Sequence, residues 1–291
     1  MELTALTLTE AAILIEQRKI SPLELTRAHL ERIERVNPML NCFITITPEA
    51  ALTSAKEAEE AILHGDYRGM LHGIPLALKD IFETRGVRTT AGSEFLANYL
   101  PDADSTVVEK LRAAGAVFLG KLNMHEWAMR TSNNNPHYGA CKNPWNLNRI
   151  PGGSSGGSGA ALAAELCMGS LGTDTGGSVR VPAALCSVVG LKPSYGRVST
   201  RGVIPLSWNL DHVGPMARCV RDVAVLLQAI AGYDASDPYS INVPADDYLA
   251  YLEAGIQGWH VALAFTRFFP EEQTGYAYEQ ATNWHLRRPA L

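Results

Sequence analysis

The sequence contains one lysine and two glycine- and serine-rich runs that could together support nucleophilic catalysis. Lys79 ends the apolar run IPLAL, where burial would lower the pKa of its amine toward neutrality and let the amine act as a base. The two runs are PGGSSGGS at residues 151–158 and GTDTGGSVR at residues 172–180. A serine hydroxyl needs such a base before it can attack a carbonyl carbon, so these features could form one catalytic unit.

The first run fits a close-packing turn or an active site better than it fits a phosphate loop, a dinucleotide-binding loop, a nucleophile elbow or a linker. It lacks the Lys-Ser/Thr of a phosphate loop and the GxGxxG of a dinucleotide-binding fold. It contains GxSxG centred on Ser154 and on Ser155, but residues 141–150 make a poor strand, which disfavours an α/β-hydrolase nucleophile elbow. A flexible linker is also disfavoured, because Pro151 precedes the run and the helix-like ALAAEL continues it. A close-packing turn remains open as an alternative.

The second run places Ser178 at the start of a predicted helix. The backbone N–H groups of Thr175, Gly176, Gly177 and Ser178 could converge there, and fixed donors of this kind make an oxyanion hole. Ser178 could equally be an ordinary helix N-cap. Lys79 could likewise serve only as the partner of Asp80 or extend its amine to solvent.

The elements that must position these residues alternate between strand and helix. Capping patterns predict helices that begin after Thr7 and at Pro22, the second of which should end at Asn37–Pro38. Further helices are predicted at 48–65, 105–116, 123–129, 178–190 and 219–233, and strands at 42–47, 73–80, 116–122, 168–174 and 259–265. This alternation indicates an α/β layer architecture around a largely buried sheet.

Composition excludes several classes of protein. The net charge of −5 and the scattered Lys and Arg residues provide no basic surface for nucleic acid. The five cysteines show no zinc-ligand spacing, and their odd number argues against a disulfide framework. The N-terminus lacks the features of a signal peptide, and no apolar run is long enough to cross a bilayer. We therefore expect a soluble cytoplasmic protein that makes no direct contact with nucleic acid or membrane.

Taken together, three segments resemble the amidase signature family. They are GIPLALKD, NPWNLNRIPGGSSGGSGAALAAE and LGTDTGGSVRVPAALCSVVGLKPSYGRVS, and the resemblance extends from about Leu8 to Leu263. It implies an α/β fold, an amidase-signature α/β/α sandwich with a mixed central sheet, that is incomplete relative to the family.

The resemblance also implies a Ser-cisSer-Lys triad that cleaves amides through an acyl-enzyme. By motif position, Ser178 is the nucleophile, Lys79 is the base, and Ser154 is the bridging serine after a cis peptide bond at Gly153. The expected oxyanion donors are Thr175, Gly176, Gly177 and Ser178. Asp174, Arg180 and Ser155 are expected to organise the site, and Thr131 to contact substrate. The implied chemistry uses no metal and no cofactor.

The C-terminal part departs from the family pattern. The chain passes from AFTRFFPEEQ almost directly to a stretch that resembles the family's natural C-terminus, which predicts an internal deletion near residues 268–275. We expect a single domain over 1–291, with N-terminal helices and a strand at 1–70, a catalytic core at 71–265 and a shortened segment at 266–291. An exposed sheet edge or apolar face, and reduced or absent activity, are expected consequences.

Three functions follow from these observations as alternatives. The first is an amidohydrolase that cleaves linear carboxamides. The second is the A subunit of a glutamyl-tRNA(Gln)/aspartyl-tRNA(Asn) amidotransferase, which releases ammonia from glutamine with partner subunits, although the loop MRTSNNNPHYGAC departs from the pattern of that protein. The third is a catalytically silent remnant that acts as a binding module. The expected partners are a small amide substrate and either a second copy of the chain or amidotransferase subunits.

Overall fold

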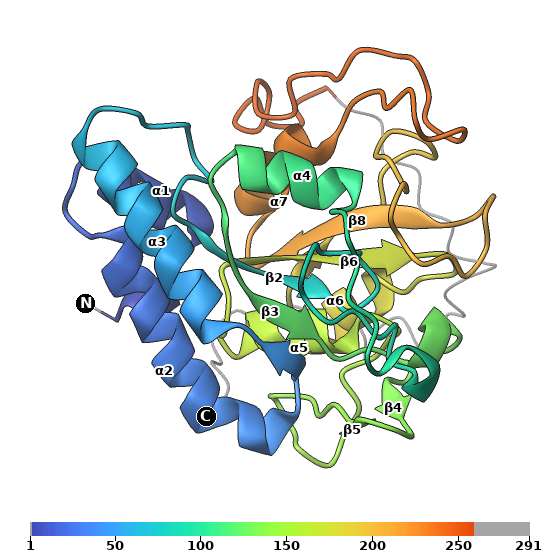
Figure 1. The fold of residues 1–291 in the computed structure, drawn as a ribbon. Coiled ribbons are helices and arrows are strands. Elements are labelled where there is room, and N and C mark those ends of the chain that lie inside the picture. The colour runs from blue at the N-terminus through green and yellow to red at the C-terminus, as the bar shows by residue number, and fades with distance from the viewer. Residues whose placement is uncertain (1, 259–291) are drawn as a thin grey trace.

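A mixed sheet of six strands forms the centre of the computed structural model, which describes residues 2–258 (Figure 1). The strand order is β1-β3-β2-β6-β8-β7. The strands are β1 (Phe43–Ile46), β2 (Pro75–Lys79), β3 (Val117–Leu122), β6 (Gly169–Asp174), β7 (Val189–Gly190) and β8 (His212–Ala217). The neighbouring strands β3, β2 and β6 run parallel, whereas β1, β8 and β7 each run antiparallel to their neighbours. The predicted α/β fold with a mixed sheet is confirmed.

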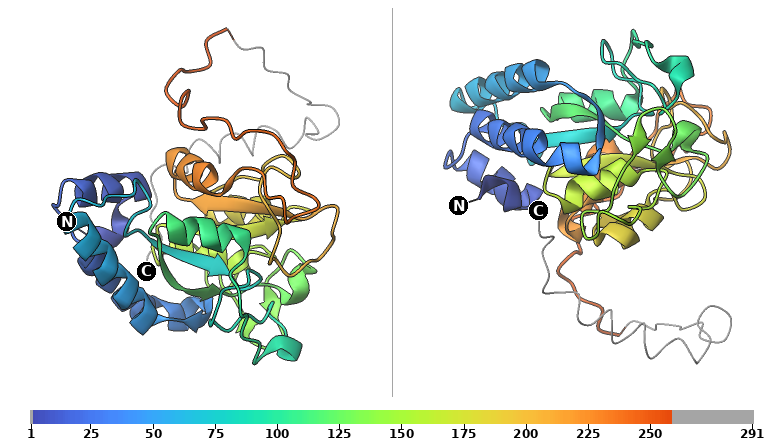
Figure 2. Two further views of the ribbon diagram at one scale, coloured as in Figure 1. Left: turned by 45° about the horizontal axis from the view of Figure 1, so that its top comes forward. Right: turned by 90° about the horizontal axis from the view of Figure 1, so that it is seen from below.

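Helices lie on both faces of this sheet (Figure 2). They are α1 (Leu8–Glu16), α2 (Pro22–Leu40), α3 (Pro48–Leu63), α4 (Thr106–Ala113), α5 (Gly156–Ala163), α6 (Arg180–Cys186) and α7 (Val220–Ile230). The short elements η1 (Leu3–Ala5), η2 (Glu94–Leu96) and η3 (Glu126–Ala128) and the small hairpin β4 (Asn134–Asn135) and β5 (Gly139–Ala140) complete the described fold.

The side chains of β2 show how the sheet divides the core into two layers. Leu76 and Leu78 join the apolar cluster that contains α1, α4 and α7, whereas Ala77 joins the cluster that contains α5 and α6. Because side chains alternate along a strand, Lys79 points to the same face as Ala77. The strand therefore aims the Lys79 amine toward the glycine-serine loop that leads into α5.

The N-terminal helices begin where the capping patterns predict. The side chain of Thr7 accepts a hydrogen bond from the N–H of Glu10 in a complete capping box, and the side chain of Ser21 accepts one from the N–H of Glu24. The predicted end of α2 at Asn37–Pro38 is wrong, because the helix continues through Pro38 to Leu40. A proline in the last turn removes only its own N–H donor, and left-handed Asn41 then ends the helix by donating to the carbonyl of Asn37.

Three other sequence predictions differ from the structure. The predicted helix 178–190 is shorter, because α6 begins at Arg180, ends before left-handed Ser187 and is followed by β7. The predicted helix 123–129 is only the single turn η3. Strand β8 lies where the sequence predicts no strand, since Gly214 and Pro215 within it are poor strand formers.

One edge of the described sheet is formed by the short strand β7. Leu185 and Leu191, which flank it in the sequence, are 45% and 36% exposed, and the predicted exposed apolar face stays a prediction. The predicted strand 259–265, the deletion near 268–275 and the segment 266–291 lie outside the described residues. Among residues 2–258, no helix combines the length and the apolar character needed to cross a membrane.

Candidate active site

Lys79 and Ser154 contact each other directly, as the sequence predicts. The Lys79 Nζ atom donates hydrogen bonds to Ser154 Oγ and to Thr173 Oγ1, each at 2.7 Å. Lys79 and Ser154 are fully buried, and Thr173 is 3% exposed. The parallel register pairs Leu78 of β2 with Leu171 of β6, which brings the end of β2 beside Thr173. The amine therefore lies among hydroxyl groups in the interior of the protein.

Burial lowers the pKa of Lys79 to about 7, because the interior disfavours the charged ammonium. The carboxylates of Asp211 and Asp174 act in the opposite direction by favouring the positive charge. At neutral pH a substantial fraction of the Lys79 amine is therefore uncharged and able to accept a proton.

The loop before α5 carries Ser154 between two walls of the site. The Gly153–Ser154 peptide bond is cis, as the family resemblance implies, whereas the bridging role of Ser154 stays a prediction. The carbonyl of Ser154 accepts a hydrogen bond from the N–H of His125 at 3.1 Å, and the N–H of Ser155 donates to the carbonyl of Ser178 at 3.2 Å. The Ser154–Ser155 peptide unit thus joins the loop that follows β3 to the turn that carries Ser178.

Two glycines of the run PGGSSGGS, one in the loop and one in the first turn of α5, are required for space. A Cβ atom on Gly153 would lie 2.8 Å from the backbone nitrogen of Asn133, and one on Gly157 would lie 2.4 Å from the carbonyl oxygen of Asn123. Both neighbours are backbone atoms that cannot rotate away. The run PGGSSGGS is therefore closely packed against the loop that follows β3, and is not a flexible linker.

The turn between β6 and α6 is organised by Asp174. Its carboxylate accepts hydrogen bonds from the N–H groups of Gly177 (2.8 Å) and Val179 (3.2 Å), and from Arg180 Nε and Nη2 (both 2.9 Å). Burial alone would raise the pKa of Asp174, but these hydrogen bonds, led by those from Arg180, lower it to about 2. The roles expected of Asp174 and Arg180 in organising a catalytic site stay predictions.

Ser178 lies on this turn, two residues before the first residue of α6, and is 5% exposed. Within residues 2–258 its hydroxyl makes no hydrogen bond to Ser154, so the two serines are linked here only through the backbone bond to Ser155. The N–H of Gly177 already has an acceptor in Asp174. The oxyanion-hole role of Thr175, Gly176, Gly177 and Ser178 therefore stays a prediction.

Ser155 and Thr131 occupy different surroundings. Ser155 is fully buried, and its hydroxyl lies 3.3 Å from both the carbonyl and the N–H of Thr173, so it ties the start of α5 to β6. Thr131 is exposed, and its backbone packs against Gly153. Its proposed contact with substrate stays a prediction.

Sequence reasoning missed two neighbours of the Lys79 amine. Thr173 is one, although its place beside Asp174 on the strand next to β2 could have identified it. The other is Asp211, whose carboxylate is bound by the Thr175 hydroxyl and by the N–H groups of Leu206 and Ser207, and which acts on Lys79 through its charge. Asp211 lies far from Lys79 in the sequence, so no local pattern could have indicated this proximity.

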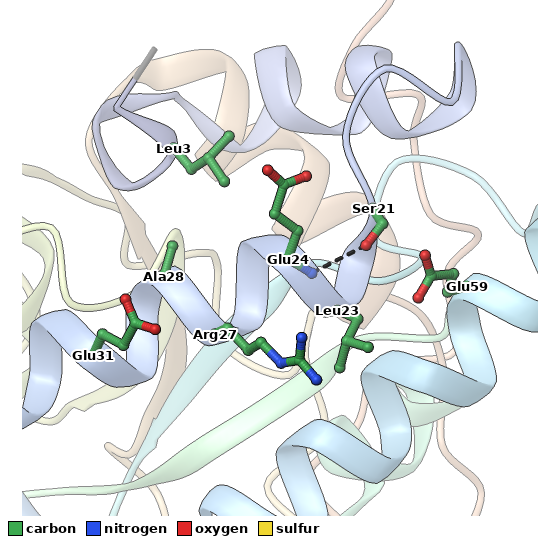
Figure 3. Close-up of a pocket in the computed structure, with 8 residues that line it drawn as sticks. All are labelled: Leu3, Ser21, Leu23, Glu24, Arg27, Ala28, Glu31 and Glu59. Carbon is green, nitrogen blue, oxygen red and sulfur yellow. Dashed lines mark hydrogen bonds between the residues drawn. The ribbon is translucent and has the colours of Figure 1, made fainter.

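A groove of about 490 Å³ lies elsewhere, beside the N-terminal helices (Figure 3). Its lining residues are Leu3, Ser21, Leu23, Glu24, Arg27, Ala28, Glu31 and Glu59. Figure 3 shows the hydrogen bond from the Glu24 N–H to the Ser21 hydroxyl within this groove. The groove shares no residue with the cluster around Lys79, so the two sites are separate.

Curated relatives match almost the whole chain. In Methylococcus capsulatus, the A subunit of the glutamyl-tRNA(Gln) amidotransferase is 52% identical over 265 residues, which are 91% of this chain and 54% of the relative. The protein of the same name from a Geobacter species is 50% identical over 90% of this chain and 54% of the relative. The chain thus spans about half the length of the curated relatives it matches.

Solved structures show the same pattern. A protein from a vestigial complex related to the origin of an s-triazine catabolic enzyme is 39% identical, with a TM-score of 0.85, over 87% of this chain and 56% of that chain. The peptide amidase of Stenotrophomonas maltophilia is 40% identical, with a TM-score of 0.79, over 85% of this chain and 52% of that chain. The family model described as Amidase matches residues 24–284. Because this model covers most of the chain, and relatives of 50–52% identity match about 90% of it, this chain belongs to the amidase family.

Proposed function

We propose that this chain is an amidohydrolase that cleaves linear carboxamides with Ser178 as nucleophile, Ser154 as proton relay and Lys79 as base. The observation that carries the proposal is the 2.7 Å contact between Lys79 Nζ and Ser154 Oγ in a fully buried setting. A buried amine with a pKa of about 7 beside a serine hydroxyl has no evident structural purpose, because its partners are neutral.

The proposed reaction moves one proton through three groups. Ser178 Oγ attacks the amide carbon and transfers its proton to Ser154 Oγ, which passes its own proton to neutral Lys79. The proton returns through Ser154 to the amide nitrogen as the carbon–nitrogen bond breaks, which releases ammonia or an amine. Water then attacks the acyl-Ser178 ester by the same relay and releases the carboxylic acid. Only neutral Lys79 starts this sequence, so kcat/KM should rise with pH through about 7.

Two other functions compete with this proposal. Identity of 50–52% to amidotransferase A subunits over about 90% of the chain favours release of ammonia from glutamine, with partner subunits that use it. The match to only about half of each relative favours a catalytically silent module instead. The first two functions share the proposed relay, whereas the third does not need it.

A fluorophosphonate probe, which reacts with an activated serine, distinguishes the two catalytic functions from the silent module. We expect it to label Ser178 in the wild-type protein and not in the Ser178→Ala variant. A panel of linear amides that includes glutamine then distinguishes a general amidase from a glutamine-specific enzyme. A folded protein that takes no label and cleaves none of the amides would overturn the proposal in favour of a silent module.

A further inference from the structure

A pocket of about 350 Å³ lies between residues 200–208 and residues 236–239, separate from the groove beside the N-terminal helices. Two aromatic side chains, Trp208 and Tyr239, line it together with the apolar residues Val203, Ile204, Pro205 and Pro238. Trp208 is 66% exposed, so its ring is open to a ligand. Since an apolar cavity of about 150 Å³ already holds benzene, this aromatic pocket has room for a ring and for part of the chain that carries it.

The charged side chains that line the aromatic pocket already have partners within residues 2–258. The two carboxylate oxygens of Asp237 accept from the N–H groups of Thr200 and Tyr239. Arg201 forms ion pairs with two carboxylates, and Glu83 accepts a hydrogen bond from a tyrosine hydroxyl. A charged ligand group would have to compete for these partners, whereas a neutral apolar group would not. The pocket therefore suits a neutral group that packs on aromatic faces.

One wall of the aromatic pocket is bonded to the turn that carries the proposed nucleophile. The segment that lines the pocket continues to Leu206 and Ser207, whose N–H groups donate to Asp211 Oδ2 at 2.8 and 3.0 Å. The other oxygen of Asp211 accepts from the hydroxyl of Thr175. Thr175 belongs to the turn that contains Ser178. A single carboxylate thus connects the pocket wall to this turn.

The same wall is bonded to the segment that follows the proposed base. The N–H of Ile204 donates to the carbonyl of Ile81 at 3.0 Å, and Val203 pairs with Phe82 in an isolated antiparallel bridge. The N–H of Ile81 in turn donates to the carbonyl of Lys79 at 2.7 Å. The wall of the aromatic pocket therefore contacts both segments that carry the proposed catalytic groups.

A row of aromatic rings leads from the pocket toward the end of β6. The ring of Tyr195 meets those of Tyr239 and His212 edge to face, at centroid distances of 6.4 and 5.5 Å. Its hydroxyl donates to the carbonyl of Trp208 at 3.1 Å. The Nδ1 atom of His212 lies 3.2 Å from the carbonyl oxygen of Asp174, where the turn with the proposed nucleophile begins. Such a row favours further aromatic contacts on its open side.

We propose that the aromatic pocket is a substrate subsite, which binds a neutral aromatic ring carried by a linear carboxamide. The inference rests on the proposed amidohydrolase function and names its substrate class. The ring packs on Trp208 and Tyr239 while the amide carbon reaches Ser178. Arylalkyl amides are favoured over short aliphatic amides, and no covalent bond forms or breaks in the pocket.

Two amides that share one acyl chain test this proposal by steady-state kinetics: 4-phenylbutanamide and butanamide. We expect the wild-type kcat/KM for the aryl amide to exceed that for butanamide by at least about tenfold. Trp208→Ala should lower this ratio by about tenfold, because the ring loses its main packing partner. Trp208→Phe, which keeps an aromatic face, should hold the ratio within about threefold of wild type.

Tyr251→Ala is the matched control, because Tyr251 is an exposed aromatic residue that does not line the pocket. It should leave the ratio unchanged. An unchanged ratio in Trp208→Ala, with Ser178 still labelled by the fluorophosphonate, would overturn the inference and leave the proposed function intact. Equal loss of activity toward both amides in both Trp208 variants would show a purely structural role and would also overturn it.

A binding measurement separates this inference from failure of the proposed function. In the Ser178→Ala variant with ¹⁵N-labelled tryptophan, the indole signal of Trp208 is identified by its loss on Trp208→Phe substitution. We expect 4-phenylbutanamide to shift this signal, and butanamide at the same concentration to leave it in place. If the wild-type protein hydrolyses no amide, the titration still decides. An unshifted Trp208 signal, or equal shifts with both amides, would contradict the subsite.

Discussion

Two fully buried lysines lie on neighbouring strands of the sheet, yet their surroundings differ. Lys79 ends β2 and points to the face that contains α5, where it contacts the hydroxyls of Ser154 and Thr173. Lys121 of β3 precedes Leu122, whose side chain belongs to that same face, so Lys121 points to the other one. There its amine lies 3.6 Å from Asp80 Oδ1 and donates to the carbonyl of Phe82 and the hydroxyl of Thr89.

The partners of each lysine decide what its amine can do. Burial lowers the pKa of Lys121 to about 8, but the negative charge of Asp80, whose Oδ1 lies 3.6 Å from the amine, acts to keep the ammonium. The closest partners of Lys79 are neutral hydroxyls, and its pKa falls to about 7. Burial alone therefore does not make a lysine a base. Because its nearest neighbours carry no charge, nothing next to the Lys79 amine holds it as an ammonium, and it is available uncharged at neutral pH.

Replacing Lys79 should have the largest effect on activity. Lys79→Met removes the proposed base, and we expect amide hydrolysis to fall by about 10²- to 10⁴-fold, the usual contribution of a general base. Thermal stability should change little, since the variant also removes the desolvation penalty of a buried amine. Activity within threefold of wild type, measured by ammonia release, would contradict the role of Lys79 and remove the basis of the comparison.

Replacing Lys121 should instead act on stability. Lys121→Met leaves Asp80 buried without its cation, which should destabilise the fold by about 3–5 kcal/mol. The double variant Lys121→Met/Asp80→Asn should recover part of this loss, because it removes the unpaired charge. Urea unfolding measures the loss of stability in the single variant and its recovery in the double variant. A Lys121→Met protein that kept its stability but lost its activity would show that the two lysines share one function.

The pH dependence of stability should reveal the lowered pKa of Lys79. The unfolded chain holds the Lys79 proton up to about pH 10.4, whereas the folded chain releases it near 7. Between these values the unfolded state binds more protons, so stability should rise with pH by up to about 1.4 kcal/mol per unit. Lys79→Met should lack this contribution. Urea unfolding at pH 7 and pH 9 measures this difference. If the free energy of unfolding changes by the same amount between the two pH values in the wild type and in Lys79→Met, the pKa of Lys79 is not lowered.

Sequence patterns were sufficient for the local parts of the site. IPLAL predicted a strand that ends at Lys79, and the glycine runs predicted turns at Ser154 and before α6. The family resemblance then supplied the cis bond after Gly153, which the structure contains. These features depend on residue types within a few positions of one another, which is why short motifs could indicate them.

The remaining features depend on contacts between distant segments. Lys121 is buried because the segment that contains Phe82 and Thr89 wraps around its amine, and nothing in AVFLGKL distinguishes it from a solvent-exposed lysine. Thr173 reaches Lys79 through the register of β2 and β6. Strand pairing and register set such neighbours, and no single segment encodes them.

The smallest expected effects come from the threonines that contact the two amines, and they form a matched pair. Thr173→Val and Thr89→Val each replace one hydroxyl, 2.7 Å from a buried lysine, by a methyl group of similar size. Each should lower the free energy of unfolding by about 1 kcal/mol, because one buried hydrogen bond is lost. Only Thr173→Val should also lower kcat/KM, by about three- to tenfold, since it frees the proposed base to leave its position beside Ser154. Equal activities in the two variants, at equal stability, would show that Thr173 only fills space and that Ser154 alone positions the Lys79 amine.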